Sequence, residues 1–201
     1  TYVHFHSAPA TSRQSIQNVE EILTVLAGYQ ICCKVYMIPL LNIQQKIMEE
    51  APNKLWVILF RRAMIRLASM IAEQLDAPAL ISGESVGQVA SQTLSNIRAT
   101  ADAADRPILR PLSGLNKDEI VCKAEEIGTY EISIEPYDDC CSFFVPIHPE
   151  TKADLETVRQ TEDRIEFDDM FITALNDVSI KTIEHPDYIK QPIEMLEKVS
   201  D

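Results

Sequence analysis

The segment PYDDCC, residues 136–141, places two carboxylates directly before two adjacent cysteines. A reactive cysteine acts as the thiolate, and a neighbouring negative charge disfavours that ionised form. These thiols are therefore either inert packing residues or groups whose chemistry does not depend on a lowered pKa. We predict that residues 136–150, rich in Pro, Asp and Cys, form a loop, and the exposure of a loop suits a reactive thiol.

Adjacency alone does not identify a reactive cysteine pair. Cys32 and Cys33 are also adjacent, and we expect them to pack at the start of a strand. Cys140 and Cys141 cannot supply a four-ligand metal site by themselves, and the chain has no CxxC partner for them. The total of five cysteines does not indicate a disulfide framework in a chain of this length, so we expect a reducing, cytoplasmic location.

A second group of candidate residues follows a short predicted strand, in the sequence SGESVGQ. Gly83 permits close backbone approach, and a predicted helix over residues 86–100 would offer free N–H groups. Glu84 would repel a phosphate, and it better suits ribose hydroxyls or an N-cap. Gln88 and Gln92 have helical i, i+4 spacing and face either a ligand or solvent. The simpler alternative is a tight turn between strand and helix.

Two further pairs of residues have types that bind ligands. Arg61 and Arg62 lie in an otherwise apolar predicted helix. One of them could bind phosphate with its planar guanidinium, or both could be solvated on the outer face of the helix. His4 and His6 alternate along a predicted strand and fit neither a zinc spacing nor a catalytic triad by themselves. His4 with Phe5 could instead contact a base through backbone atoms.

The hydrophobic pattern predicts the elements that must position these residues. Apolar and β-branched runs indicate strands, whereas apolar residues at helical spacing with capping signals indicate helices. Strands that alternate with helices predict an α/β fold with a parallel sheet, in which ligands bind at the carboxyl ends of strands. We predict strands at residues 2–6, 33–40, 79–82 and 108–112, and helices at residues 12–26, 42–50, 54–75, 86–100, 116–127, 154–164 and 167–176.

Composition narrows the class of protein. The chain has 201 residues, 46% of them hydrophobic, which is enough for one domain with a real core. No apolar run reaches the length of a membrane span, and we expect neither a signal peptide nor a membrane partner. The net charge of −13 argues against a surface that coats nucleic-acid phosphates, so we expect most contacts with any nucleic acid to lie elsewhere.

Several motifs in a fixed order resemble one family. The chain contains HFHSAP, FRRAMIRLA, SGESVGQVASQTLSNI, LRPLSGLNKDEI, IGTYEISIEPYDDCC and VPIHPETKADL. Over roughly residues 1 to 175 it is similar to the catalytic domain of the tRNA 4-thiouridine synthetases, also called tRNA sulfurtransferases, which also serve thiamine biosynthesis. GESVGQVASQT and PYDDCC are the most specific of these motifs.

This resemblance implies a PP-loop ATPase of adenine-nucleotide α-hydrolase-like fold, a three-layer parallel sheet flanked by helices. Such enzymes adenylate a uridine carbonyl oxygen in tRNA, and a persulfide formed by a cysteine desulfurase then delivers sulfur and displaces AMP. Cys141, or else Cys140, matches the sulfur-handling cysteine. Our own hypothesis adds that Asp139 or Asp138 binds Mg²⁺ or transfers protons. The positions that match the ATP contacts are His4, Phe5, Arg61, Gly83 and Gln92.

The chain departs from the family pattern at its start. The expected Ser-Gly-Gly-x-Asp-Ser phosphate loop and first strand do not precede HFH, and an RNA-binding THUMP region is not seen. We therefore expect a partial PP-loop domain over residues 1–180 and a polar tail over residues 181–201. We also expect weak or no activity from this piece alone. A missing central strand would leave backbone groups unpaired, which favours a homo-oligomer.

Three alternatives remain open. The chain could be another PP-loop tRNA-modifying ATPase, although the spaced cysteine pairs of such enzymes are not visible. It could be a non-catalytic nucleotide-binding domain of the universal-stress type, although the phosphate loop typical of that class is not visible either. It could also be a degenerate product that keeps the fold and has lost the activity.

Overall fold

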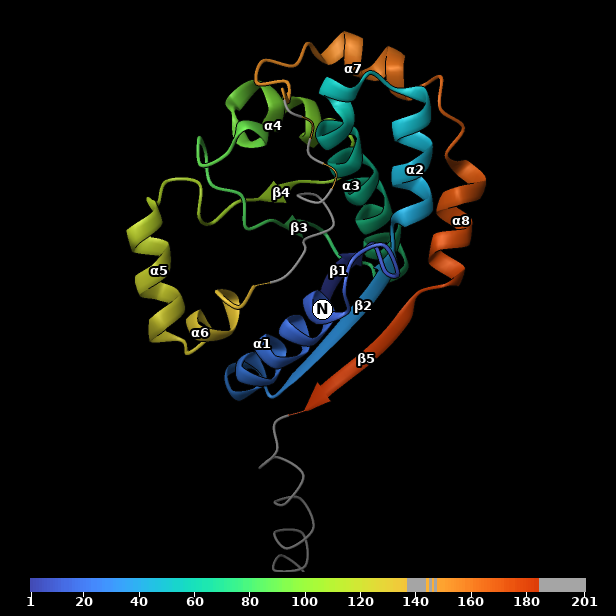
Figure 1. The fold of residues 1–201 in the computed structure, drawn as a ribbon. Helices are drawn as coiled ribbons and strands as arrows, with labels where there is room; N and C mark the ends of the chain where they lie inside the picture. Colours follow the sequence, from blue (N-terminus) through green and yellow to red (C-terminus); the bar gives the residue numbers. More distant parts are fainter. Residues whose placement is uncertain (137–143, 145, 147, 185–201) are drawn as a thin grey trace, which may run out of the picture.

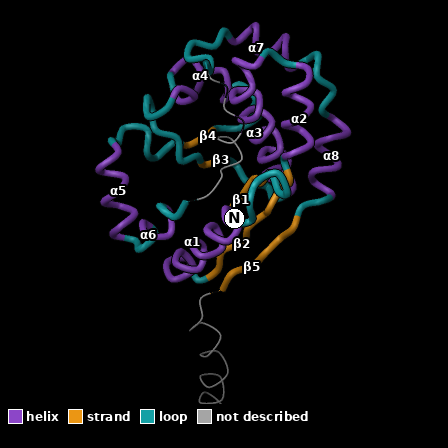
Figure 2. The backbone as a smooth tube through the Cα atoms, viewed as in Figure 1, coloured by secondary structure: helices purple, strands orange, loops and turns teal. Residues whose placement is uncertain are grey.

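Strands alternate with helices along most of the chain, as the sequence predicts (Figures 1 and 2). The computed structural model describes residues 1–136, 144, 146 and 148–184. The strands are β1 (Tyr2–His6), β2 (Cys32–Pro39), β3 (Leu80–Ile81), β4 (Ile108–Leu109) and β5 (Ser179–Glu184). The α-helices are α1 (Gln14–Gln30), α2 (Leu41–Glu50), α3 (Trp56–Gln74), α4 (Leu94–Ala101), α5 (Lys117–Glu126), α6 (Tyr130–Ser133), α7 (Leu155–Glu162) and α8 (Asp168–Asn176). The 3-10 helices η1 (Asn53–Leu55) and η2 (Ala90–Gln92) lie shortly before α3 and α4.

The strands form two sheets. One has the order β1-β2-β5, in which β1 runs parallel to β2 and β5 runs antiparallel to β2, and the other pairs β3 with β4 in parallel. The α/β class with parallel strands is confirmed, but the single continuous sheet that we expected is divided. The reason is that, within the described residues, β1 pairs only with β2 and β3 pairs only with β4.

Helices cover both faces of β2, whose residues are almost continuously apolar and largely buried. One face of β2 packs with Leu23 and Ala27 of α1. The opposite face packs in a larger core with residues of α2, α3 and α8, among them Phe60, which is fully buried. Because side chains alternate along a strand, Val35 and Tyr36 enter different cores. The three expected layers are therefore present around β2 (Figure 1).

The region that precedes α4 differs most from its prediction. Residues 86–100 do not form one helix, because Gly87 has a φ of 79°, outside helical geometry. The chain turns there and enters η2, and α4 begins only after Thr93, whose Oγ1 accepts a hydrogen bond from the backbone N–H of Asn96 at 3.2 Å. Gln88 and Gln92 consequently do not share a helix face, as we had expected.

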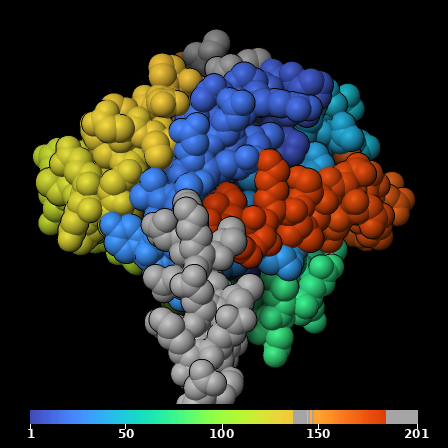
Figure 3. Space-filling view, turned by 90° about the horizontal axis from the view of Figure 1, so that it is seen from below, coloured from blue at the N-terminus to red at the C-terminus, as the bar shows by residue number. Residues whose placement is uncertain are grey.

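Strand β5 was not predicted from the sequence; it pairs with β2 from Cys32↔Glu184 to Met37↔Ser179 and lies beside α1 (Figure 3). Lys181 of β5 forms an ion pair with Glu20 of α1. The expected boundary between residues 180 and 181 falls inside this strand, and the rest of the expected tail, residues 185–201, is outside the described residues. Within the part that the structure describes, no helix combines the length and apolar character needed to cross a membrane.

Candidate functional site

The turn after β3 presents Gly83 at the surface and Glu84 in the interior. A Cβ atom added at Gly83 would meet no atom within 4 Å, so this position borders open space. The Glu84 side chain is only 5% exposed, which requires strong partners for its charge. The buried carboxylate of Glu84 therefore requires positively charged or hydrogen-bonding side chains beneath the exposed turn.

Two arginines from different elements share the Glu84 carboxylate. Arg61 of α3 donates from Nη2 to Oε1 at 2.5 Å, and Arg110, just after β4, donates from Nε to Oε2 at 2.7 Å. Arg61 also donates from Nη1 to Ser91 Oγ of η2 at 3.1 Å. This network brings together segments that contain three expected ATP contacts, Arg61 itself and the neighbours of Gly83 and Gln92. Glu84 is an ion-pair partner rather than an N-cap, and sequence reasoning missed Arg110.

The adjacent arginine serves a different purpose, so Arg61 and Arg62 are not a solvated pair. Arg62 is 1% exposed and donates from Nη2 to Glu162 Oε2 of α7 at 2.5 Å. Its Nη1 also lies 3.2 Å from Asp102 Oδ2. Consecutive helix residues point about 100° apart, which explains why one arginine faces the turn after β3 and its neighbour faces α7.

Asn96 anchors the turn that carries Gln92. The side chain is fully buried, and its Nδ2 donates to the carbonyl oxygens of Ala90 at 2.8 Å and Glu150 at 2.7 Å. Its Oδ1 accepts from the backbone N–H of Ala153 at 3.0 Å. One amide of α4 therefore connects η2, which contains Gln92, to the segment over residues 150–153.

Asn96→Ala is expected to lower the free energy of unfolding by about 2–3 kcal/mol, because buried backbone groups lose their partners. Urea denaturation followed by circular dichroism measures this change. Asn176→Ala, at the exposed end of α8, is the matched control and should change stability by less than about 0.5 kcal/mol. Equal effects of the two substitutions would show that the Asn96 bonds contribute nothing specific.

The remaining predicted site residues lie elsewhere or outside the description. His4 and Phe5 are on β1 in the other sheet, half-buried, and Phe5 packs against the larger core. Asp139, Cys140 and Cys141, like Asp138, are not among the described residues. Of the earlier cysteine pair, Cys33 is buried at the start of β2 as expected, whereas Cys32 is exposed.

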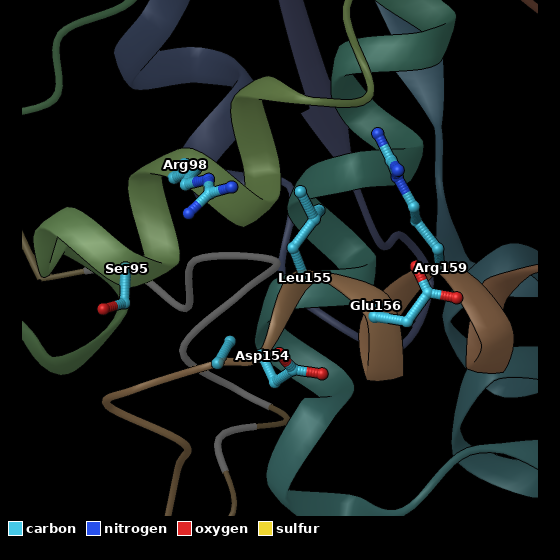
Figure 4. Close-up of a pocket in the computed structure, with 7 residues that line it drawn as sticks. Ser95, Arg98, Asp154, Leu155, Glu156 and Arg159 are labelled. Atoms are coloured by element: carbon cyan, nitrogen blue, oxygen red, sulfur yellow. The ribbon is translucent and has the colours of Figure 1, made fainter.

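A polar hollow of about 360 Å³ lies between α4 and the start of α7, and Figure 4 shows the side chains around it. Of the predicted site residues that the structure describes, none lines this hollow. Two of its charged groups, Asp154 and Arg159, already have structural partners. Asp154 Oδ2 accepts the backbone N–H of Thr157 at 2.9 Å, and Arg159 donates from Nε to Asp102 Oδ2 at 3.0 Å. The hollow therefore carries no argument for a ligand, and the Arg61–Glu84–Arg110 network remains the candidate site.

Comparison with known proteins agrees with the motif resemblance. A probable tRNA sulfurtransferase of Moorella thermoacetica is 42% identical over 184 residues, 92% of this chain and 47% of that protein. A probable tRNA sulfurtransferase of Thermus thermophilus is also 42% identical over 184 residues, 92% of this chain and 45% of that protein. The crystal structure of a 4-thiouridine synthetase–RNA complex with bound ATP superimposes with a TM-score of 0.85 at 39% identity, covering 90% of this chain and 48% of that one.

The family to which this chain is similar can be assigned over most of the described residues. The chain spans about half the length of the curated relatives it matches. The model of the family described as thiamine biosynthesis protein (ThiI) matches residues 1–167, which include β1, the turn after β3 and both arginines bound to Glu84. This chain therefore belongs to the thiamine biosynthesis protein (ThiI) family.

Proposed function

We propose that this chain is part of an ATP-dependent tRNA sulfurtransferase that converts a uridine to 4-thiouridine and also supplies sulfur for thiamine biosynthesis. The observation that supports this most is the network around Arg61, which bonds this matched position to Glu84 and Ser91, the chain neighbours of the matched positions Gly83 and Gln92. The similarity at 39% identity to a synthetase with bound ATP supports an adenine nucleotide as its ligand.

In the proposed reaction, the uridine carbonyl oxygen attacks the α-phosphate of ATP and releases pyrophosphate, and the outer sulfur of a cysteine persulfide then displaces AMP from the uridine. A second thiol breaks the remaining sulfur–sulfur bond by forming a disulfide with the carrier cysteine, which leaves the sulfur on the uridine. His4 and Phe5 contact the base, and Arg61 meets phosphate with its guanidinium. Gly83 and Gln92 complete the nucleotide contacts at the exposed turn. The sulfur is carried as a persulfide on a cysteine of the PYDDCC segment.

Cys141 is the proposed sulfur carrier, and Cys140 is the alternative. Asp139 or Asp138 would hold Mg²⁺ together with the phosphates of ATP, since carboxylate oxygens suit this ion. The described residues contain no group of three His, Cys, Asp or Glu side chains that could hold a metal ion.

The proposed partners follow from the same reaction. tRNA is the substrate, and the related synthetase in complex with RNA supports this choice. Because the chain carries a net charge of −13, we place most of the RNA contacts on another region or partner. A cysteine desulfurase supplies the persulfide. A homo-oligomer remains part of the proposal, because β1 and β3 each pair on one edge within the described residues.

Arg61→Ala is expected to weaken ATP binding by roughly 10- to 100-fold, the value of a charge-assisted hydrogen bond to phosphate. Isothermal titration calorimetry of the chain with ATP measures this. Arg98→Ala, which removes an exposed arginine of α4, is the matched control and should bind ATP like the wild type. Failure of the wild-type chain to bind ATP would contradict the nucleotide-binding part of the proposal.

A further inference from the structure

The Glu84 carboxylate binds two arginines, an arrangement that is not needed for an acid that only repels phosphate. Each of its oxygens accepts a hydrogen bond from a different arginine, and the three side chains are 5% (Glu84), 21% (Arg61) and 16% (Arg110) exposed. The partners come from α3 and from the segment after β4. A single buried acid therefore fixes the relative position of two guanidinium groups.

The charges of this cluster favour an anion. Two guanidinium cations and one carboxylate leave a local charge of +1, in a chain whose net charge is −13. Guanidinium groups present planar, rigid sets of donors that match phosphate oxygens. Two of them held close together would normally repel each other, and the carboxylate between them offsets that repulsion.

Arg110 is not saturated by protein partners. Its Nε donates to Glu84 and its Nη1 approaches the Ile108 carbonyl oxygen at 3.4 Å. Its Nη2 is buried and, within the described part of the chain, has no hydrogen-bond partner. A buried donor without an acceptor is costly, so this nitrogen is suited to an acceptor that arrives with a ligand.

We propose that Glu84 is a positioning residue that holds Arg61 and Arg110 as a paired anion site, and that Arg110 binds phosphate oxygens of the nucleotide together with Arg61. This inference rests on the proposed function, because it assigns the phosphate side of that same nucleotide site. It also gives Glu84 a role opposite to the one its charge suggests, since an acid beside phosphate would otherwise weaken binding.

The opposite signs of the two effects make the test sharp. Calorimetry compares AMP with adenosine, which lacks the phosphate, on the wild-type chain and on Glu84→Gln. If Glu84 positions the arginines, the substitution weakens AMP binding about tenfold and leaves adenosine binding unchanged. If Glu84 only repels phosphate, removal of its charge strengthens AMP binding, and the proposal is overturned. An equal loss for both ligands shows general damage to the fold and also overturns it.

Further variants keep the test decisive. Arg110→Gln leaves the bond between Arg61 and Glu84 intact and should also weaken AMP binding selectively, whereas Arg110→Lys should restore only part of it because it lacks the planar donors. Glu73→Gln, which removes an equal charge from an exposed glutamate of α3, should change neither ligand. If Glu84→Gln does not fold, the Arg110 variants decide, and AMP binding unchanged in Arg110→Gln overturns the proposal.

Failure of the paired site can be distinguished from failure of the proposed function. Wild-type binding of adenosine and AMP with no selective loss in the variants overturns the paired site and leaves the nucleotide-binding function standing. If the wild type binds neither, the proposed function fails, and pyrophosphate becomes the probe. Pyrophosphate binding that is lost in both Glu84→Gln and Arg110→Gln then supports the paired site, and any other result with pyrophosphate overturns it.

Discussion

Glu162→Gln is expected to lower the free energy of unfolding by about 3–5 kcal/mol, because it removes one partner from a buried ion cluster. The Glu162 side chain is 4% exposed and accepts from Arg62 Nε at 3.0 Å and from Arg66 Nη2 at 2.9 Å. Among the described residues, the substitution leaves the Asp102 carboxylate as the one negative charge bonded to the buried Arg62, whose Nη1 also donates to the Ala99 carbonyl oxygen. Because the cluster joins α3, α4 and α7, its disruption should loosen all three helices.

The stability that Glu162 provides should depend on pH. Burial raises the pKa of Glu162, but the hydrogen bonds from Arg62 and Arg66 lower it more, so its pKa lies below the ordinary value of 4.5. A pKa that is lower in the folded state means that the stabilisation is complete well above pH 4.5 and is lost as the pH falls through the folded-state value. The difference in stability between wild type and Glu162→Gln should therefore be largest near neutral pH and shrink in acid.

Chemical denaturation at several pH values measures both effects. In a thermal melt of a chain of this size, each kcal/mol lost from the free energy of unfolding should lower the melting temperature by roughly 2–4 °C. Glu156→Gln is the matched control, since it changes the same group on the exposed face of α7 and should alter stability by less than about 1 kcal/mol. A loss no larger than that of the control, or one that grows in acid, would show that the cluster does not stabilise the fold through ionised Glu162.

Cys141→Ser is expected to abolish the loading of sulfur onto the chain by a cysteine desulfurase. A persulfide requires a sulfur–sulfur bond, which a serine hydroxyl cannot form. The neighbouring aspartates oppose a thiolate, but a persulfide is intrinsically more acidic than a thiol, so their negative charge hinders the loaded form less. Mass spectrometry of the intact chain after incubation with cysteine and a desulfurase detects the added sulfur, and this readout needs neither ATP nor tRNA.

Two substitutions serve as controls for this loss. Cys140→Ser should still accept sulfur if Cys141 is the carrier, and the reverse result would transfer the role to Cys140. Cys122→Ser removes an exposed free thiol of α5 and should have no effect. Loading that persists when both Cys140 and Cys141 are replaced would contradict a sulfur-carrying role for the PYDDCC segment.

Local signals were sufficient for several elements of the fold. The long helix predicted at residues 54–75 is α3, Trp56–Gln74, because its apolar spacing and lack of Pro and Gly act within the segment itself. The helix predicted at residues 116–127 is α5, which begins at a capping box between Asn116 and Glu119. The motifs of the chain also identified its family, because they preserve residue types in a fixed order.

Contacts between distant segments decided the rest. The sequence could not predict β5, because its exposed residues become a strand only by pairing with β2. It suggested that Glu84 repels phosphate and suits ribose hydroxyls or an N-cap, because the arginines that neutralise this acid lie 23 and 26 residues away along the chain. The sequence likewise could not assign different roles to Arg61 and Arg62. Their environments differ because the turn after β3 packs against one side of α3 and α7 packs against another. Sequence alone thus determined the family and the local elements, whereas only tertiary packing decided which charged groups meet, because burial forces each charge to find a partner across the fold.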